Sequence, residues 1–143
     1  STISWRVETN SVAGYTLYVN ASTTPALKSG NYSFSDYVPS GASPDYSFTL
    51  PAASSTFAYT VEGSNISSFF NDNGSNCNAG TGNTTDTCYV GFTTSPFAIA
   101  QTNSSNYPTG ATTTVRVKAG IGSSKIQENG TYQAAVTVTA IAL

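Results

Sequence analysis

Residues 129–143 read NGTYQAAVTVTAIAL, a turn sequence followed by a run in which apolar and polar side chains alternate. Val136 and Val138 fall on one face of an extended chain, and Thr137 and Thr139 fall on the other. Side chains along a strand change face at every residue, so this pattern predicts a half-buried β-strand that runs to the last residue.

The first nine residues, STISWRVET, show the same alternation. Ile3, Trp5 and Val7 share one face, and Trp5 is the only tryptophan of the chain. The segment NSVAG at 10–14 follows as a short hinge of Asn, Ser and Gly. We therefore expect residues 1–9 to be a donor strand, whose three apolar side chains seat in a neighbouring copy. The alternative is that this run pairs within its own sheet, as a first strand usually does.

The closing run has an apolar neighbour in the sequence. GATTTVRVKAG at 110–120 places Val115 and Val117 on one face, and the turn ENG at 128–130 separates it from the run at 131–142. We expect these two runs to pair as neighbours in one sheet, which would keep the C-terminal strand in its own subunit.

Further strand candidates are rich in Thr, Val, Tyr and Phe and are bounded by Gly, Pro, Asn and Ser. No helical period of useful length appears, although NISSFFNDN at 65–73 is compatible with one capped turn that docks Phe69 and Phe70 on the core. The sequence predicts an all-β protein: one jelly-roll or immunoglobulin-like β-sandwich of about eight strands, spanning residues 1–143 as a single domain. The remaining strand candidates are GYTLYVNA (14–21), YSFTL (46–50), TFAYTVEG (56–63), TCYVGFT (87–93) and PFAIAQT (96–102).

The composition limits the possible partners. Charged residues make up 8% of the chain, where about 25% is typical, and the net charge is -2. Five basic residues form no basic patch, which disfavours nucleic acid as a partner. No apolar run approaches the roughly 20 residues of a membrane span. Because aromatic and β-branched residues are plentiful, the chain is predicted to be folded rather than disordered.

The two cysteines, Cys77 and Cys88, flank a polar loop with two glycines. A structural metal site wants four ligands, and the chain has no His to supply them. We therefore predict a disulfide across the loop at 71–88, and with it an oxidising, extracellular location. Two free thiols in a reducing compartment are the alternative.

Asn-X-Ser/Thr triplets occur seven times, in a chain so rich in Ser and Thr that chance accounts for about half of them. Several are candidates for N-glycosylation if the protein is secreted. They begin at Asn20, Asn31, Asn65, Asn73, Asn83, Asn103 and Asn129.

No catalytic centre is expected. The chain lacks His, its seven carboxylates are scattered, and no Ser lies in a G-x-S-x-G motif. Asp72 and Asp86 bracket an Asn-rich loop with oxygen ligands suited to Ca²⁺, but the EF-hand spacing is absent and a simple turn explains the loop. We expect no metal and no cofactor. The tyrosines in or beside turns either form a sugar-stacking surface or cover the ends of the sandwich. These are Tyr18, Tyr32, Tyr37, Tyr46 and Tyr107.

Both ends of the chain resemble a known group. GYTLYVNASTTPALKSG at 14–30 resembles the early strand pair of secreted bacterial surface domains, and GATTTVRVKAG followed by ENGTYQAAVTVTA resembles their ending. The architecture is similar to that of the TasA-like biofilm filament subunits and the archaeal bundling pili and threads. The resemblance implies a jelly-roll-like surface domain that polymerises by strand exchange, with no catalytic residues.

We therefore expect a structural subunit of an extracellular, pilus-like filament at the cell surface. Identical subunits would be its partners, joined head to tail by donor-strand complementation, with covalent glycans as a further possibility. The alternative is a cell-surface adhesin or carbohydrate-binding β-sandwich module that does not polymerise.

Overall fold

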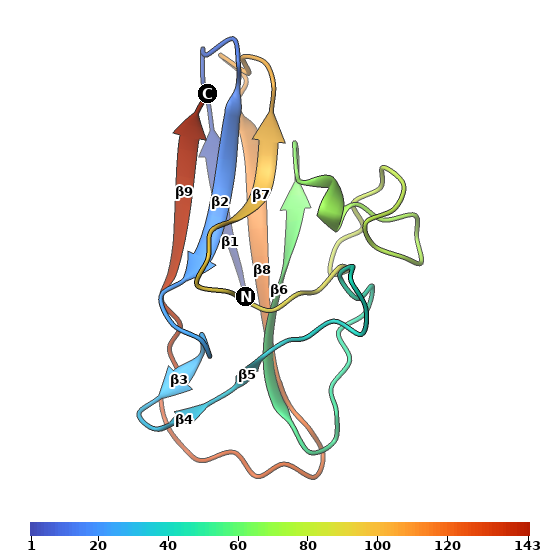
Figure 1. Ribbon diagram of the computed structural model, residues 1–143, viewed down its shortest axis with the longest axis vertical. Helices are drawn as coiled ribbons and strands as arrows, with labels where there is room; N and C mark the ends of the chain where they lie inside the picture. Colours follow the sequence, from blue (N-terminus) through green and yellow to red (C-terminus); the bar gives the residue numbers. More distant parts are fainter.

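The computed structural model describes residues 1–143 and consists of β-strands and loops with one short 3-10 helix (Figure 1). Six strands have six residues or more, and three have only two. The elements are β1 (Thr2–Val7), β2 (Tyr15–Ala21), β3 (Lys28–Ser29), β4 (Tyr32–Ser33), β5 (Ser35–Asp36), β6 (Ser55–Gly63), η1 (Ser68–Phe70), β7 (Phe97–Thr102), β8 (Ala111–Ile121) and β9 (Val136–Ala142).

The strands form a four-stranded sheet in the order β1-β8-β6-β5, a three-stranded sheet in the order β7-β2-β9, and the small β3-β4 pair. Pairing is antiparallel except between β5 and β6. Figure 1 shows the two larger sheets as two layers, with β1 and β9 along one side and β6 and β7 along the other. The all-β prediction is confirmed, and this arrangement is consistent with a β-sandwich.

The core lies between the two larger sheets. On β2, Leu17 and Val19 are each 1% exposed, and they belong to the same buried cluster as Val61 of β6 and Val115 of β8. The alternation of apolar residues along β2 and β8 therefore marks the faces that meet, as the period-two pattern predicts. Burial of these aliphatic and aromatic side chains is the main stabilising contribution to the fold.

The expected hairpin between 110–120 and the closing run is wrong. β8 and β9 lie in different sheets. Where β1 pairs with β8, the other edge of β8 is already paired with β6, so no edge is left for β9. β9 instead pairs with β2, from Tyr15 opposite Ala142 to Ala21 opposite Val136. The connection at 122–135 is long enough to pass from one layer to the other, which a two-residue hairpin turn does not do.

Two predicted strands are not regular strands. Residues 87–93 form only single bridges, since Asp86 and Cys88 both take a left-handed backbone conformation with φ of 63° that interrupts an extended chain. Residues 46–50 join no sheet and lie over the outer face of β6, where Phe48 contacts Tyr89.

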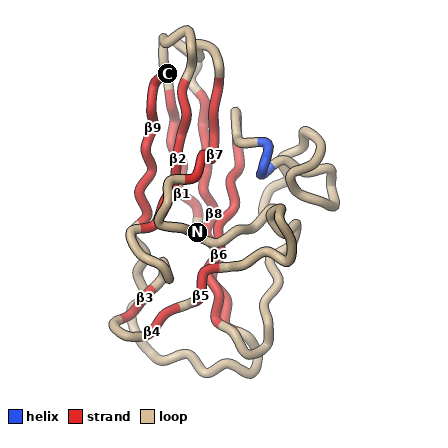
Figure 2. The backbone as a smooth tube through the Cα atoms, in the orientation of Figure 1, coloured by secondary structure: helices blue, strands red, loops and turns tan.

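The predicted helical turn is confirmed as η1, which Figure 2 marks as the only helix. The Ser67 side chain accepts a hydrogen bond from the Phe69 N–H at 3.4 Å and caps the turn. Phe70 is fully buried, and its ring meets those of Phe69, Tyr59 and Phe97.

Candidate functional site: a groove between two edge strands

The N-terminal run lies in the sheet of its own chain, which is the alternative that the sequence left open. β1 pairs with β8 along its whole length, from Thr2 opposite Arg116 to Val7 opposite Ala111. The hydroxyls of Ser4 and Thr114 are hydrogen-bonded at 2.7 Å. Of the three candidate donor side chains, Trp5 and Val7 pack against the core of their own chain, whereas Ile3 is 56% exposed.

The end of β1 is held by the turn at 103–110. Arg6 donates through Nη2 to the carbonyl oxygens of Pro108 (3.0 Å) and Thr109 (2.6 Å). The Asn106 side chain donates to the Val7 carbonyl at 2.9 Å and accepts from the Thr9 N–H at 2.7 Å. These contacts and the β8 ladder join β1 to one continuous stretch of chain, residues 103–117.

An apolar groove of about 300 Å³ opens between β1 and the β9 side of the other sheet. Ile3 is 56% exposed and Trp5 is half-buried, so the face of β1 that the pattern identified is only partly covered. We call this cavity the edge groove. All nine residues that line it are apolar: Ile3, Trp5, Leu27, Phe57, Phe92, Val115, Val117, Ala134 and Val136.

Unpaired backbone borders the edge groove on both sides. β1 ends the four-stranded sheet and β9 ends the three-stranded sheet, so each has one edge without a neighbouring strand. Beyond Val117, which exchanges backbone hydrogen bonds with Ser1, β8 continues to Ile121 with no partner strand on the β1 side. Such edges are templates for pairing with another extended chain.

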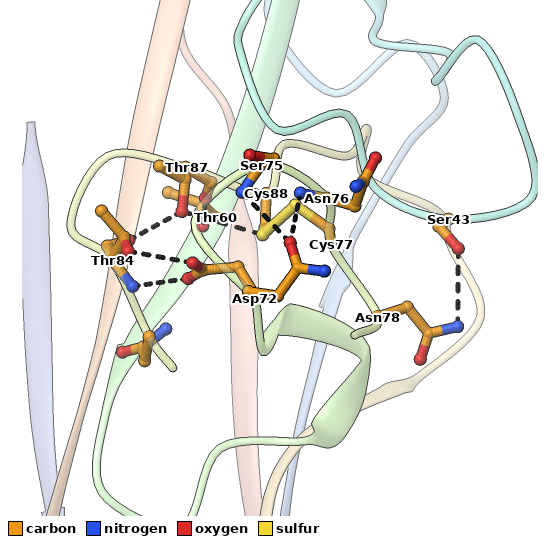
Figure 3. The surroundings of a disulfide bond; sticks show 12 residues. Ser43, Thr60, Asp72, Ser75, Asn76, Cys77, Asn78, Thr84, Thr87 and Cys88 are labelled. Atoms are coloured by element: carbon orange, nitrogen blue, oxygen red, sulfur yellow. Dashed lines mark hydrogen bonds between the residues drawn. A yellow bond between two sulfur atoms is a disulfide. The ribbon is translucent and has the colours of Figure 1, made fainter. Parts of the chain in front are cut away.

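The opposite side of the sandwich is covered by a loop that carries the disulfide (Figure 3). Cys77 and Cys88 are bonded, as predicted, and both are buried. Figure 3 shows Asp72 beside them, directed at Thr84. The Asp72 carboxylate accepts from the Thr84 N–H (2.6 Å), the Thr84 hydroxyl (2.9 Å) and the Gly74 N–H (2.8 Å). The loop is thus closed by a covalent link and a buried carboxylate.

These contacts change the acidity of Asp72. The Thr84 backbone N–H lowers the pKa of its carboxyl group most, burial opposes this, and the Gly74 N–H and Thr84 hydroxyl lower it further. The two candidate calcium ligands, Asp72 and Asp86, contact different partners within the chain. Asp86 accepts from the Tyr89 hydroxyl and pairs with Lys118 at 3.0 Å.

Half of the charged side chains form ion pairs. Arg116 of β8 bonds Glu62 of β6 through two nitrogens, at 2.6 and 3.1 Å. The Lys118 ammonium lies 4.9 Å from the centre of the Tyr89 ring. The carboxylates of Glu62 and Asp86 are thus engaged with cations on the outer face of the four-stranded sheet.

The seven glycosylation triplets differ in the state of the side-chain nitrogen that would carry a sugar. The Asn83 side-chain nitrogen donates a hydrogen bond to the Val61 carbonyl at 3.2 Å, and the Asn20 side-chain nitrogen donates one to the Ala21 carbonyl at 3.3 Å. Asn73 is exposed, and its oxygen accepts from the Ser75 and Asn76 N–H groups. The other four are exposed and their amides make no hydrogen bond within the chain: Asn31, Asn65, Asn103 and Asn129.

The five tyrosines singled out in the sequence do not gather on one surface. Tyr32 lies on β4 and Tyr107 lies in the turn at 103–110, at opposite ends of the molecule (Figure 1). Tyr37 is buried, and its hydroxyl donates to Asp45 at 2.6 Å. The prediction that these five tyrosines form one sugar-stacking surface is therefore wrong.

No helix of the protein has the length and apolar character needed to cross a membrane. Comparison with known proteins yields no matching family model, no matching curated protein and no matching solved structure. The geometry of the chain is therefore the basis on which a function can be inferred.

Proposed function

We propose that the protein is a structural subunit of an extracellular filament, assembled head to tail by exchange of the N-terminal strand. The observation that carries the proposal is the edge position of β1, whose Ile3 and Trp5 line the edge groove and which is joined to β2 by residues without regular secondary structure. In the filament, β1 of one subunit would occupy the β8 edge of the next. The resemblance of both ends of the sequence to filament-subunit domains supports the same function.

Exchange would preserve the contacts that β1 makes. Its partners are the β8 edge and the turn at 103–110, and the same partners on a neighbouring copy could accept it. Residues 8–14 between β1 and β2 have no regular secondary structure and would act as the hinge. The Asn106 contacts with Val7 and Thr9 must break for the strand to leave, and they re-form on the neighbour.

The proposal includes a jelly-roll or immunoglobulin-like arrangement and a cell-surface location. Two facing sheets of four and three strands support the first, and the disulfide is compatible with the second. Head-to-tail contacts do not close on themselves, so repetition produces a fibre rather than a ring or dimer. Hydroxyl-rich exposed faces and glycans at the four free Asn triplets would then cover the fibre surface.

A cysteine pair can report where β1 is seated. The γ-oxygens of Ser4 and Thr114 are 2.7 Å apart, so Ser4→Cys with Thr114→Cys places two sulfurs within bonding reach. If β1 is exchanged, oxidation of assembled protein gives a covalent ladder on a non-reducing denaturing gel, and electron microscopy shows fibres. Only intrachain bonds, together with monodisperse particles at every concentration, would overturn the proposal.

Trp5→Asp tests whether the apolar contacts of Trp5 are needed for assembly. It should abolish fibres and the ladder. Val38→Asp introduces the same charge at an apolar residue that is 83% exposed on the opposite side, and it should leave assembly unchanged. Equal loss of fibres in both variants would point to a general effect of charge and contradict the role of the edge groove.

A further inference from the structure

A second cavity, of about 460 Å³, is lined by a different set of residues from the edge groove, with Phe92 common to both. It opens between the loop at 37–42, the segment at 90–94 and the start of β7. Phe69, Phe97 and Val38 line it and are partly or fully exposed, whereas Tyr59 is buried to 3% exposure. We call it the flank cleft. Its volume falls in the range of small-molecule sites.

Two polar groups at the flank cleft lack partners within the chain. Asp36 accepts the Ala26 N–H at 3.0 Å through Oδ1, but its Oδ2 is buried and makes no hydrogen bond. The hydroxyl of Tyr59 also makes no hydrogen bond within the chain. Burial raises the pKa of the Asp36 carboxyl group, against the lowering effects of the Ala26 N–H and of Lys28. Buried polar atoms are normally paired, so the unpaired Asp36 Oδ2 indicates a missing donor.

The charge of the lining residues excludes acidic ligands. Asp36 is the only ionisable carboxylate there, and no Lys or Arg lines the flank cleft. A phosphate or carboxylate ligand would meet the like charge of Asp36 with no Lys or Arg among the lining residues, which is unfavourable in a partly desolvated site.

The aromatic rings do not form a cage for an ammonium group. Tyr59 and Phe92 stack on each other with centroids 4.3 Å apart, and Phe57 stacks on Phe92 at 5.4 Å. An aromatic cage encloses an ammonium group with several ring faces, and Phe92 is not free to supply one because Tyr59 and Phe57 stack on it. Phe69 and Phe97 remain as exposed apolar surface at the mouth, beside the hydroxyl-bearing Thr24 and Thr94.

We infer that the flank cleft binds a neutral sugar, as one or two pyranose rings. A pyranose has an apolar C–H face that packs on an aromatic ring and hydroxyls that both donate and accept hydrogen bonds. Its apolar face would lie against Phe97 and Phe69, and its hydroxyls would donate to Asp36 and bond the Tyr59 hydroxyl. This inference does not depend on filament assembly, because every residue involved belongs to one chain and lies away from β1.

Saturation-transfer NMR tests the inference with named probes: glucose, galactose, mannose and N-acetylglucosamine, with their β1,4-linked disaccharides. Choline and glucose 6-phosphate serve as the cationic and anionic probes. At least one neutral sugar should give a signal. Asp36→Asn should weaken its binding about tenfold, the usual cost of losing a charged hydrogen bond. Phe97→Ala, at a residue 36% exposed, should weaken it by a similar factor.

Tyr107→Ala is the matched control, since Tyr107 is 65% exposed and lies outside the flank cleft. It should leave sugar binding unchanged, and circular dichroism should show that all three variants are folded. The inference is overturned if no neutral sugar binds, if only choline or the phosphorylated sugar binds, or if sugar binding survives both Asp36→Asn and Phe97→Ala.

Discussion

The two sides of the sandwich differ in how far their apolar faces are covered. Along β1 and β9 the apolar faces meet solvent, with Ile3 56% exposed and Trp5 half-buried at the edge groove. Along β6 and β7 the chain adds a cover, residues 64–96, which buries Phe70 completely. The strands on both sides carry the same alternating pattern, so the difference in exposure comes from the presence or absence of a covering segment.

The covered side shows what one chain needs in order to close an edge. About thirty residues are ordered there, and ordering costs roughly 1–2 kcal/mol for each residue backbone. A disulfide and the buried Asp72 carboxylate hold this segment in place. The other side has no such segment within residues 1–143, and Ile3 stays 56% exposed there.

The largest expected effect is the removal of the ring that anchors the cover. Phe70→Ala should lower the free energy of unfolding by about 3–5 kcal/mol, because it empties a fully buried site between Tyr59 and Phe97. Urea unfolding followed by Trp5 fluorescence measures it. A loss below about 1 kcal/mol would show that the cover does not depend on this ring.

Opening the disulfide should come next. Cys77 and Cys88 are 11 positions apart, and a closed loop of this length stabilises a chain by about 3 kcal/mol in the chain-entropy model. The Cys77→Ser, Cys88→Ser double variant should unfold at a correspondingly lower urea concentration, while the wild-type protein treated with reductant should approach it. Coincident unfolding curves for the variant and the oxidised protein would contradict this.

Acid should weaken the covered side. Hydrogen bonds and ion pairs lower the pKa values of Asp45, Glu62, Asp72 and Asp86 in the folded protein, against the effect of burial. A lowered folded pKa stabilises the protein above the unfolded value, and this contribution is lost as the pH falls through the folded value. The free energy of unfolding should therefore drop below about pH 4.

Asp72→Asn is the variant that isolates one of these groups. It should be less stable than the wild type at pH 7, and the difference should shrink as the pH falls below about 4. Urea titrations at a series of pH values compare the two proteins. A difference that stays constant with pH would exclude ionisation of Asp72 as the cause.

The smallest effect on the folded chain is expected at the open side. Ile3→Asp changes a residue that is 56% exposed, so the free energy of unfolding of the monomer should shift by less than about 1 kcal/mol. Strand exchange would give Ile3 the same contacts on a neighbouring subunit, so this variant should still form fibres. A loss of more than about 2 kcal/mol in the monomer would break the comparison between the two sides.

Local patterns in the sequence predict some features well. Alternation identifies β1, β2, β6, β7, β8 and β9, and Ser67 with its following phenylalanines identifies the capped turn η1. The isolated cysteine pair identifies the disulfide. Each of these signals lies within a short stretch of chain, where strand periodicity, a cap or a loop closure acts directly.

The features missed depend on contacts between distant residues. The sequence places β9 beside β8, whereas strand pairing across the sandwich joins β9 to β2. The two-residue strands β3, β4 and β5 carry no detectable period. The edge groove and the flank cleft combine side chains from several separate segments, so no single sequence motif predicts either of them.

The ion pairs on the outer face of β6 and β8 would also affect contacts between copies in the proposed filament. Six of the twelve charged side chains neutralise one another in pairs: Arg6 with Glu8, and Arg116 and Lys118 with Glu62 and Asp86. With a net charge of only -2, the molecule has little long-range field for dissolved ions to screen. Contacts between copies should therefore change little from dilute buffer to sea-water ionic strength.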